Sequence, residues 1–252
     1  MNTCVVVPHY DHLEQFRRFL PELAAFGLPL VVVDDASPVS DADAVEHLLA
    51  GCGVETTLVR HAENLGKGGA VMTGLRTARD AGFSHALQVD ADGQHDVAEI
   101  SIFLQAAMDR PDSVICGEPV FDESISSLRY YSRYITLSLC RLETLSREIR
   151  DALCGFRLYP LIPITSIIDD CHLGERMAFD PEILVRAVWA GIPLHYVPVH
   201  VAYPEGGVSH FHYLRDNGEI SWMHTRLLVG MLIRLPTLLK RKFNGRHTVT
   251  GA

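Results

Sequence analysis

Residues 85–96, HALQVDADGQHD, join a short apolar run to three carboxylates, a glycine and a histidine. The same order, an apolar run followed by polar side chains, occurs in CVVVPHYDH at 4–12 and in LPLVVVDDAS at 28–37. Further strand-like runs lie at 54–59 and 113–117, and helix-like segments separate the strands at 11–26, 41–50, 66–81 and 96–109. Continuous apolar strands that alternate with helices predict an α/β fold with a mostly parallel central sheet, covered on both faces.

The second half of the chain is less regular. We expect a helix over 127–150, a loop and a strand within DALCGFRLYP at 151–160, and a helix over 180–191. Residues 192–203 are strand-like, and 213–242 are mostly helical and basic. A chain of 252 residues with 48% hydrophobic content is long enough for one α/β domain. We therefore expect a single Rossmann-like domain over 1–212 and a basic, amphipathic helical extension over 213–252.

The charge of the chain is unevenly distributed. The net charge is −9, yet residues 220–252 contain no acidic side chain. Six basic residues occur there: Arg226, Arg234, Lys240, Arg241, Lys242 and Arg246. A basic segment on an acidic body predicts an anionic partner surface. No aromatic–basic stacking surface accompanies it, so nucleic acid is not the expected partner.

The same segment indicates contact with a membrane rather than passage through one. Arg234 interrupts the apolar run and Pro236 should kink or break a helix, so a spanning helix is not expected. Two arrangements stay open: an in-plane helix at the membrane surface, and an amphipathic helix docked on the body of the protein.

The cysteines and the start of the chain indicate the compartment. Six cysteines are scattered without CxxC or zinc spacing, and MNTCVVVPHYDH lacks the features of a signal peptide. We therefore expect reduced thiols and a cytoplasmic protein, peripheral on the inner face of the cell membrane.

Ligands of parallel α/β sheets bind at the carboxyl ends of the strands. Asp90 and Asp92 follow the strand-like run of 85–89 and can turn both carboxylates to one side. Carboxylate oxygens are the ligands that Mg²⁺ or Mn²⁺ prefers, so the pair is a candidate metal site. The alternative is an acidic turn that only caps the next helix. Asp96 is the expected cap of that helix and has no metal role.

Two other strand ends carry polar groups suited to a nucleotide. Asp34 and Asp35 close the second strand, where a carboxylate can accept from a nucleobase or a ribose, although DASP is also ordinary turn chemistry. ENLGKGGAVMTG at 63–74 places glycines and a lysine at the start of a helix, which suits phosphate. It is not a P-loop, because His61 stands where the first glycine is needed.

Taken together, these stretches resemble glycosyltransferase family 2, whose members have the GT-A fold. The resemblance covers roughly residues 3–210 and rests on VVVPHYDH, VVVDDAS, ENLGKGGAVMTG, QVDADGQH, CGFRLYP and FDPEILVRAVWAG. Within the family the chain looks most like the dolichyl- and polyprenyl-phosphate sugar synthases. The segment YPEGGVSHFHYLRDN at 203–217 is similar to bacterial members associated with lipid or aryl-polyene assembly.

The resemblance implies a role for each matching residue. Pro8 and Tyr10 would line the nucleobase pocket and Asp35 would bind the base. Asn64, Gly66 and Lys67 would lie near the ribose and the sugar phosphate, and Asp90 near the ribose or sugar. Asp92 would bind the metal, with Gln94 in the same shell. Residues 154–157 would form a loop beside the donor sugar and acceptor, and Ser209 and His210 would belong to a segment that closes over the diphosphate.

The chemistry at the acceptor depends on what the acceptor is. A lipid phosphate is already ionised and needs no base, so Arg129, Arg133 and Arg157 would act as phosphate clamps. A lipid hydroxyl would need a carboxylate to take its proton, for which Asp151 is the first candidate and Glu175 the second.

We therefore expect a metal-dependent, inverting glycosyltransferase with a UDP- or GDP-linked sugar donor and a lipid-linked acceptor. One alternative is a sugar-nucleotide nucleotidyltransferase, although the N-terminal stretch VVVPHYDHLEQF lacks the basic glycine-rich signature of such enzymes. Another is a non-catalytic nucleotide-sugar sensor on the same fold, which would bind base and phosphate but lack the DxD or the acceptor loop.

Overall fold

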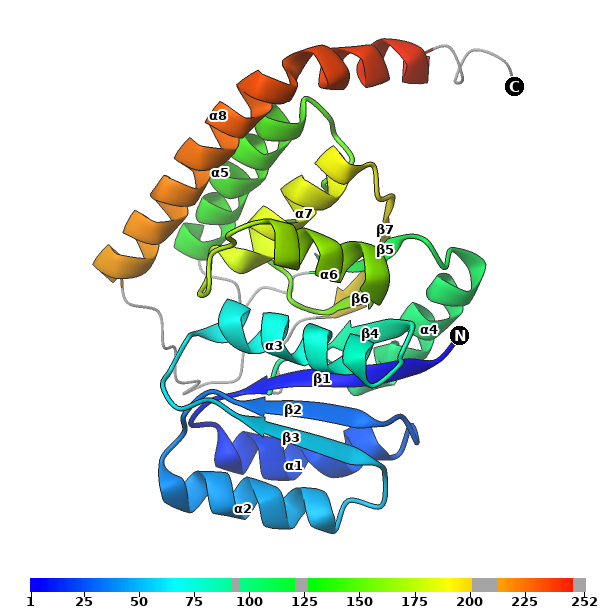
Figure 1. The fold of residues 1–252 in the computed structure, drawn as a ribbon, viewed down its shortest axis with the longest axis vertical. Helices are drawn as coiled ribbons and strands as arrows, with labels where there is room; N and C mark the ends of the chain where they lie inside the picture. The colour runs from blue at the N-terminus through cyan, green and yellow to red at the C-terminus, as the bar shows by residue number, and fades with distance from the viewer. Residues whose placement is uncertain (92–95, 121–126, 201–212, 247–252) are drawn as a thin grey trace.

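The computed structural model describes residues 1–91, 96–120, 127–200 and 213–246, without the side chains of 127–130, 132, 213–214 and 244–246. Within these ranges seven strands form one sheet in the order β3-β2-β1-β4-β6-β5-β7 (Figure 1). The strands are β1 (Thr3–His9), β2 (Leu30–Asp34), β3 (Thr56–Arg60), β4 (His85–Gln88), β5 (Val114–Val120), β6 (Arg157–Pro160) and β7 (Leu194–His200). The predicted α/β class with a mostly parallel sheet is confirmed.

The direction of the strands creates a crevice beside β1. The chain adds β2 and then β3 on one side of β1, and then returns to place β4 on the other side, all parallel. The carboxyl ends of β1 and β4 therefore flank the point where the strand order reverses, which is where ligands bind in such sheets. We call this edge of the sheet the carboxyl rim.

β6 is the exception to the parallel arrangement. It runs antiparallel to both of its neighbours, β4 and β5, and Arg157 at its start pairs with Gln88 at the end of β4. The loop that precedes β6 therefore reaches the same carboxyl rim as the residues that follow β4.

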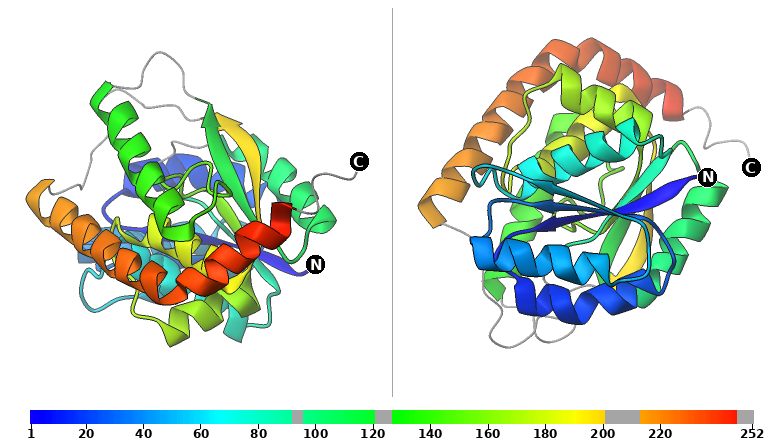
Figure 2. Two further views of the ribbon diagram at one scale, coloured as in Figure 1. Left: turned by 90° about the horizontal axis from the view of Figure 1, so that it is seen from above. Right: turned by 60° about the horizontal axis from the view of Figure 1, so that its bottom comes forward.

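Helices cover both faces of the sheet (Figure 2). The helices are α1 (Leu13–Ala24), α2 (Val39–Ala50), α3 (Lys67–Asp80), α4 (Ile100–Asp109), α5 (Ser127–Thr144), α6 (Leu161–Asp170), α7 (Phe179–Ala190) and α8 (Tyr213–Arg246), with a 3₁₀ turn over Val97–Glu99. One core joins a sheet face to α1, α2 and α4. The other core joins the opposite face to α3, α6 and α7, with α5 and α8 packed outside them. Alternate residues of β1 enter the two cores, as a strand buried on both faces requires.

α8 is a long helix that packs against α5 and α7. It continues through Pro236, and its axis changes direction in its C-terminal half (Figure 1). Proline removes one backbone hydrogen bond and crowds the preceding turn, which accounts for a bend without an end. Among the helices of the described ranges, none is both long and apolar enough to cross a membrane.

Candidate active site

The carboxyl rim gathers most of the residues that the sequence singled out. Pro8 lies in β1 and Tyr10 follows it, Asp35 follows β2, and Asp90 follows β4. Asn64, Gly66 and Lys67 lie at or just before the start of α3, which runs back across the sheet from the same edge. Segments far apart in the chain therefore meet at one place, as the strand order predicts.

Asp35 anchors the loop that leads into α3. Its carboxylate accepts hydrogen bonds from the backbone N–H groups of Leu65 (2.9 Å) and Gly66 (2.7 Å). It also accepts from Nδ1 of His61 at 2.7 Å, so this ring nitrogen carries the hydrogen. Nε2 of His61 lies 2.9 Å from the hydroxyl of Thr73, which can then donate to it. The buried Asp35 thus fixes both the loop and the histidine behind it.

The glycines of this loop are required by space as well as by conformation. Gly66 has a φ of 94°, and a Cβ on it would lie 2.8 Å from the carbonyl oxygen of Glu175. The same carbonyl accepts from the N–H of Gly69 at 2.7 Å. The start of α3 is therefore held between Asp35 on one side and the 173–176 loop on the other.

Glu175 itself lies behind the start of α3. With residues 63–65 and Arg226 it lines a cavity of about 400 Å³ between the loops and α8. Its carbonyl supports the glycine loop, as described above, so the backbone of this residue contributes to the site.

Lys67 links two carboxylates across the crevice. Its Nζ donates to Oδ2 of Asp90 at 2.7 Å and to Oδ2 of Asp180, in the first turn of α7, at 3.0 Å. Burial lowers the pKa of a lysine, but the two carboxylates outweigh burial and hold the pKa of Lys67 above its ordinary value. Lys67 therefore carries a fixed positive charge at the carboxyl rim.

Arg157 lies beneath this cluster rather than on the surface. Its side chain is 1% exposed and donates to the backbone carbonyls of Asp180 (2.7 Å) and Ala152 (2.9 Å). Its Nη1 also lies 3.7 Å from Oδ1 of Asp180. These contacts join β6, the loop before it and α7 under the ion-pair cluster.

A second support comes from the end of β4. The hydroxyl of Tyr159 in β6 donates to Oε1 of Gln88 at 3.2 Å, and Nε2 of Gln88 lies 3.5 Å from Oδ1 of Asp90. The carboxylate of Asp90 is thus held by Lys67 on one oxygen and by Gln88 on the other.

Gly155 packs directly against this contact. A Cβ on it would lie 2.5 Å from Nζ of Lys67 and 2.6 Å from Oδ2 of Asp90. The CGFR segment therefore needs a glycine here because any side chain would displace the lysine, the carboxylate or both.

Asp151 anchors the loop that contains Gly155. One oxygen accepts from Nε (3.0 Å) and Nη2 (2.7 Å) of Arg133, and the other from the backbone N–H groups of Leu153 (3.0 Å) and Cys154 (2.7 Å). Arg133 lies in α5, so this pair connects α5 to the loop. Burial raises the pKa of the Cys154 thiol to about 12, which leaves it unreactive.

A second buried pair lies at the ends of β1 and β2. Nδ1 of His9 is 3.3 Å from Oδ1 of Asp34. Burial raises the pKa of the Asp34 carboxyl, but hydrogen bonds with His9 and Ser37 outweigh burial and hold that pKa below its usual range. Asp34 is therefore an ionised group within the floor of the carboxyl rim.

Several predicted site residues lie outside the described part of the structure: Asp92, Gln94, Ser209, His210 and the side chain of Arg129. Among the side chains that are described, no group of three or more His, Cys, Asp or Glu could hold a metal ion. Asp96 caps the 3₁₀ turn through a hydrogen bond from the N–H of Ala98 at 2.9 Å, as predicted.

Several residues of this site were not predicted, among them Gln88, Tyr159 and His9 as well as the following two. Asp180 belongs to FDPEIL, which shows an ordinary acidic first turn of a helix, and nothing in that pattern points to Lys67. His61 was considered only as a departure from a P-loop, although a histidine one residue after a strand end was a signal that it faces the carboxyl rim.

Comparison with known proteins agrees with this architecture. Residues 4–179 match the family model described as Glycosyl transferase family 2. The chain is 27% identical to the dolichyl-phosphate beta-glucosyltransferase of Drosophila melanogaster, over 90% of this chain and 75% of that protein. It is 25% identical to the undecaprenyl-phosphate mannosyltransferase of Micrococcus luteus, over 83% of this chain and 87% of that protein.

Solved structures show the same fold at lower identity. Glucosyl-3-phosphoglycerate synthase from Mycobacterium tuberculosis, crystallised with Mn²⁺, UDP-glucose and phosphoglyceric acid, superposes with a TM-score of 0.63 at 13% identity. The match covers 91% of this chain and 79% of that one.

Proposed function

The chain belongs to glycosyl transferase family 2, and we propose that within this family it transfers one sugar from a nucleoside diphosphate to a lipid-linked phosphate. The observation that carries the proposal is the cluster of Lys67, Asp90 and Asp180 at the carboxyl rim, supported from below by Arg157. At the switch point of the sheet, the fixed cation suits the phosphates of a nucleotide sugar, and the carboxylates suit its hydroxyl groups or a metal ion.

We place the donor half of the site in the first 94 residues. We assign Pro8, Tyr10 and Asp35 to the nucleobase and Asn64, Gly66 and Lys67 to the ribose and sugar phosphate. A carboxylate has about four acceptor positions. Three of those on Asp35 hold Leu65, Gly66 and His61, which leaves about one for an N–H of the base. The glucosyl-3-phosphoglycerate synthase of the same fold was crystallised with UDP and with UDP-glucose, and UDP is the donor nucleotide that we propose.

A divalent cation, Mg²⁺ or Mn²⁺, fits the residues of this half. The carboxylate of Asp90 is held at the carboxyl rim by Lys67 and Gln88, and Asp92 and Gln94 follow it in the sequence with further oxygen donors. When bound, such a cation would stabilise the negative charge that develops on the departing diphosphate. We assign Asp92 and Gln94 to the cation and Asp90 to the sugar or ribose.

The contacts of Asp151, in the loop expected beside the acceptor, favour a lipid phosphate over a lipid hydroxyl as the acceptor. Asp151 accepts four hydrogen bonds, and a general base would have to lose several of them before it took a proton. A phosphate acceptor needs no base, because it is already ionised. We therefore assign Asp151 and Arg133 to positioning the loop, Arg157 to positioning Asp180, and Arg129, Ser209 and His210 to the phosphates. Glu175 remains the candidate base if the acceptor is a hydroxyl.

We further propose that the acceptor phosphate attacks the anomeric carbon directly, which inverts its configuration. The C–O bond to the acceptor forms as the bond to the nucleoside diphosphate breaks, on opposite sides of the sugar. Lys67 would offset charge on the leaving group, since it keeps its proton.

We also propose that the protein contacts the inner face of the cell membrane through α8. Besides Leu232 and Leu239, the described part of α8 exposes four apolar side chains, of which the last three follow the first by seven, eleven and twenty-one residues; this spacing places the four toward one side of a helix. They are Trp222, Val229, Ile233 and Phe243, which we call the α8 outer stripe. Apolar side chains with flanking basic residues are typical of helices that lie in a membrane surface. All six cysteines are free, which agrees with a reducing compartment.

Calorimetric titration with UDP and GDP, with and without Mn²⁺, tests the donor site. We expect wild type to bind UDP only weakly without metal, and Asp92→Ala to lose the metal-dependent part. Asp96→Ala is the matched control, because this nearby carboxylate caps a turn and should leave nucleotide binding unchanged. Equal binding with and without metal would favour a sensor instead.

A transfer assay tests the reaction and the acceptor. UDP-[¹⁴C]glucose is incubated with polyprenyl phosphate, with polyprenol, or with a sugar 1-phosphate. We expect label in the polyprenyl phosphate product and release of UDP. Release of label as glucose 1-phosphate, together with formation of a new UDP-sugar from the added sugar 1-phosphate, would support a nucleotidyltransferase. Label in polyprenol would move the base role to Glu175.

A further inference from the structure

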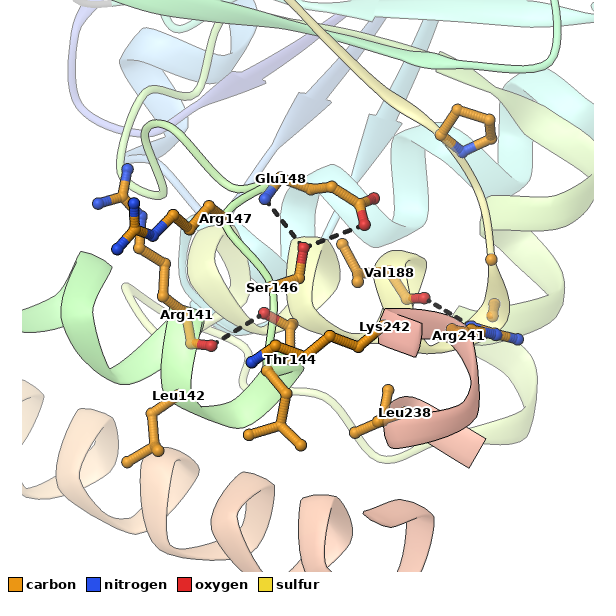
Figure 3. Close-up of a pocket in the computed structure, with 14 residues that line it drawn as sticks. Arg141, Leu142, Thr144, Ser146, Arg147, Glu148, Val188, Leu238, Arg241 and Lys242 are labelled. Carbon is orange, nitrogen blue, oxygen red and sulfur yellow. Dashed lines mark hydrogen bonds between the residues drawn. The ribbon is translucent and has the colours of Figure 1, made fainter. Parts of the chain in front are cut away.

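A large cavity lies away from the carboxyl rim, between the C-terminal ends of three helices. Its volume is about 1180 Å³, and it is lined by the end of α5 and the loop after it, the end of α7, and the end of α8 (Figure 3). None of its lining residues belongs to the candidate active site described above. The cavity therefore requires a separate explanation.

The charge of the lining is strongly positive. Four basic side chains line the cavity, Arg141, Arg147, Arg241 and Lys242, against one carboxylate, Glu148. Lys242 extends from α8 toward Thr144 at the end of α5 in Figure 3. The cations that line the cavity thus come from α5, from the loop after it and from α8.

Part of this charge serves the protein itself. Arg241 donates to the carbonyls of Val188 (3.1 Å) and Trp189 (3.0 Å) at the end of α7, and Nε of Arg141 donates to the carbonyl of Ile149. Each helix C-terminus is equivalent to roughly half a negative charge. The ends of α5 and α7 together with Glu148 therefore offset about two of the four cations, which leaves a surplus of about two.

The lining is also apolar on one side. Leu142 of α5 and Leu238 of α8 face the cavity, and Figure 3 shows them on the side away from Arg147 and Glu148. Leu142 is about half exposed, so this apolar side continues to the protein surface. A free inorganic anion would gain nothing from the leucines, whereas an amphipathic ligand would use both sides.

We propose that this cavity binds the phosphate-bearing head group of an anionic lipid, separately from the acceptor at the active site. The surplus cations, Arg147 and Lys242, contact the phosphate, and Leu142 and Leu238 contact the first methylene groups below it. The forked donors of arginine suit phosphate oxygens, and Lys242 adds a point charge.

This inference rests on the proposed membrane contact, and its test separates the two. Wild type is sedimented with vesicles of phosphatidylcholine alone and with vesicles that also contain phosphatidylglycerol. The variants are Lys242→Gln and Arg147→Gln, with Lys240→Gln as matched control. Lys240 has the same charge on the same helix two residues away, but it does not line the cavity.

Removal of one positive charge from a protein at an anionic membrane weakens vesicle binding about five-fold, even where the charge belongs to no specific site. We expect that loss for Lys240→Gln, and a further ten-fold loss or more for Lys242→Gln and Arg147→Gln on phosphatidylglycerol vesicles. Binding to phosphatidylcholine alone should be the same for all four proteins. Equal losses for Lys240→Gln and Lys242→Gln would overturn the cavity site while leaving membrane contact intact.

A second experiment uses NMR to follow titration of the protein with two ligands. One is inorganic phosphate, and the other is short-chain phosphatidylglycerol below its micelle concentration. Shifts at the cavity with the lipid, reduced in Lys242→Gln, support the proposal even if vesicle binding is absent. Equal affinity for inorganic phosphate and the lipid would mean a site for a free anion, and absence of shifts with both would overturn the proposal.

Discussion

Gly155 lies where the loop before β6 meets the ion-pair cluster, and its missing side chain is what allows them to meet. We predict that Gly155→Ala lowers kcat/KM by about 100-fold, since displacement of a reacting group by about 1 Å has costs of this size. The atoms that a Cβ would meet are the flexible ends of Lys67 and Asp90, so stability should fall by less than about 1 kcal/mol. Steady-state kinetics and thermal unfolding measure the two effects.

Two other glycines provide the controls for that variant. A Cβ on Gly68 would clash with the Cβ of Phe179 and with the backbone of Gly174, neither of which can move easily. Gly68→Ala should therefore lose about 1–3 kcal/mol of stability. Gly218 has open space around it within α8, so Gly218→Ala should stabilise the helix by up to about 1 kcal/mol and leave activity unchanged. Equal stability losses in Gly155→Ala and Gly68→Ala would contradict our account.

Asp34 should contribute to stability in a pH-dependent way. Because its pKa in the folded protein is held below the ordinary value of about 4, its contribution is complete above that pH and is lost as the pH falls through the folded pKa. We predict that wild type is about 1–3 kcal/mol more stable than Asp34→Asn at pH 7 and that the difference shrinks below about pH 4. Urea unfolding at several pH values measures it.

Asp43→Asn is the control for this series. Asp43 is an exposed carboxylate near Arg60, and such pairs contribute little, so this change should alter stability by less than about 0.5 kcal/mol at every pH. A difference between wild type and Asp34→Asn that grows in acid would mean that His9 and Ser37 do not stabilise the ionised carboxyl.

At the scale of single residues, sequence predicted the position of side chains better than their contacts. The positions of Asp35, Lys67 and Asp90 could be predicted from the rule that the ends of parallel strands meet at one edge, and all three lie at the carboxyl rim in the structure. Their partners come from elsewhere in the chain. Asp180 meets Lys67 across 113 residues, and no local pattern encodes that distance.

One buried carboxylate of α7 joins this helix to α8. Glu182 is 0% exposed and accepts from two nitrogens of Arg186, from Arg226 of α8 and from the N–H of Gly174. We predict that Glu182→Gln lowers the free energy of unfolding by about 3 kcal/mol, because two arginines lose their counter-charge in a partly buried place. Chemical denaturation followed by circular dichroism measures the loss.

Glu219 provides the comparison at the same scale. It pairs with Arg215 within α8 at 3.3 Å, and both side chains are exposed. Glu219→Gln should therefore change stability by less than about 0.5 kcal/mol. Similar losses for Glu182→Gln and Glu219→Gln would show that burial does not strengthen the first network.

At the scale of elements, the strands and most helices were predictable, and proline explains the main omission. α6 begins directly after Pro160 and includes Pro163 in its first turn, where proline is tolerated. The two prolines of LYPLIPIT at 158–165 predict an irregular segment, so α6 is not predicted from the sequence. The helix expected over 11–26 is confirmed as α1, which begins after His12 without a side-chain cap; Asp11 before it has a φ of 53°.

For the whole molecule, the α8 outer stripe and α2 lie on opposite sides of the sheet, which provides a matched pair of exposed residues (Figure 1). Ile233 on α8 is 74% exposed and Val39 on α2 is 77% exposed. We predict that Ile233→Ser weakens vesicle binding about ten-fold, since burial of such a side chain contributes about 1.5–3 kcal/mol. Vesicle sedimentation measures binding.

Val39→Ser should bind vesicles like wild type, because that side of the molecule would face away from the membrane. If Ile233→Ser and Val39→Ser lost vesicle binding equally, the proposal that the α8 side of the molecule faces the membrane would be wrong. If neither did, the basic residues of α8 alone would account for attraction to anionic lipid.

The backward direction of β6 also affects the order in which the protein is built during translation. β4 is an interior strand, but the neighbour that covers its second edge is made about 70 residues later. At roughly 5–20 residues per second, that edge stays unpaired on the ribosome for several seconds. An unpaired strand edge is a template for association with other chains. The interval between synthesis of β4 and synthesis of β6 is therefore one in which the nascent protein is exposed to aggregation and benefits from chaperones.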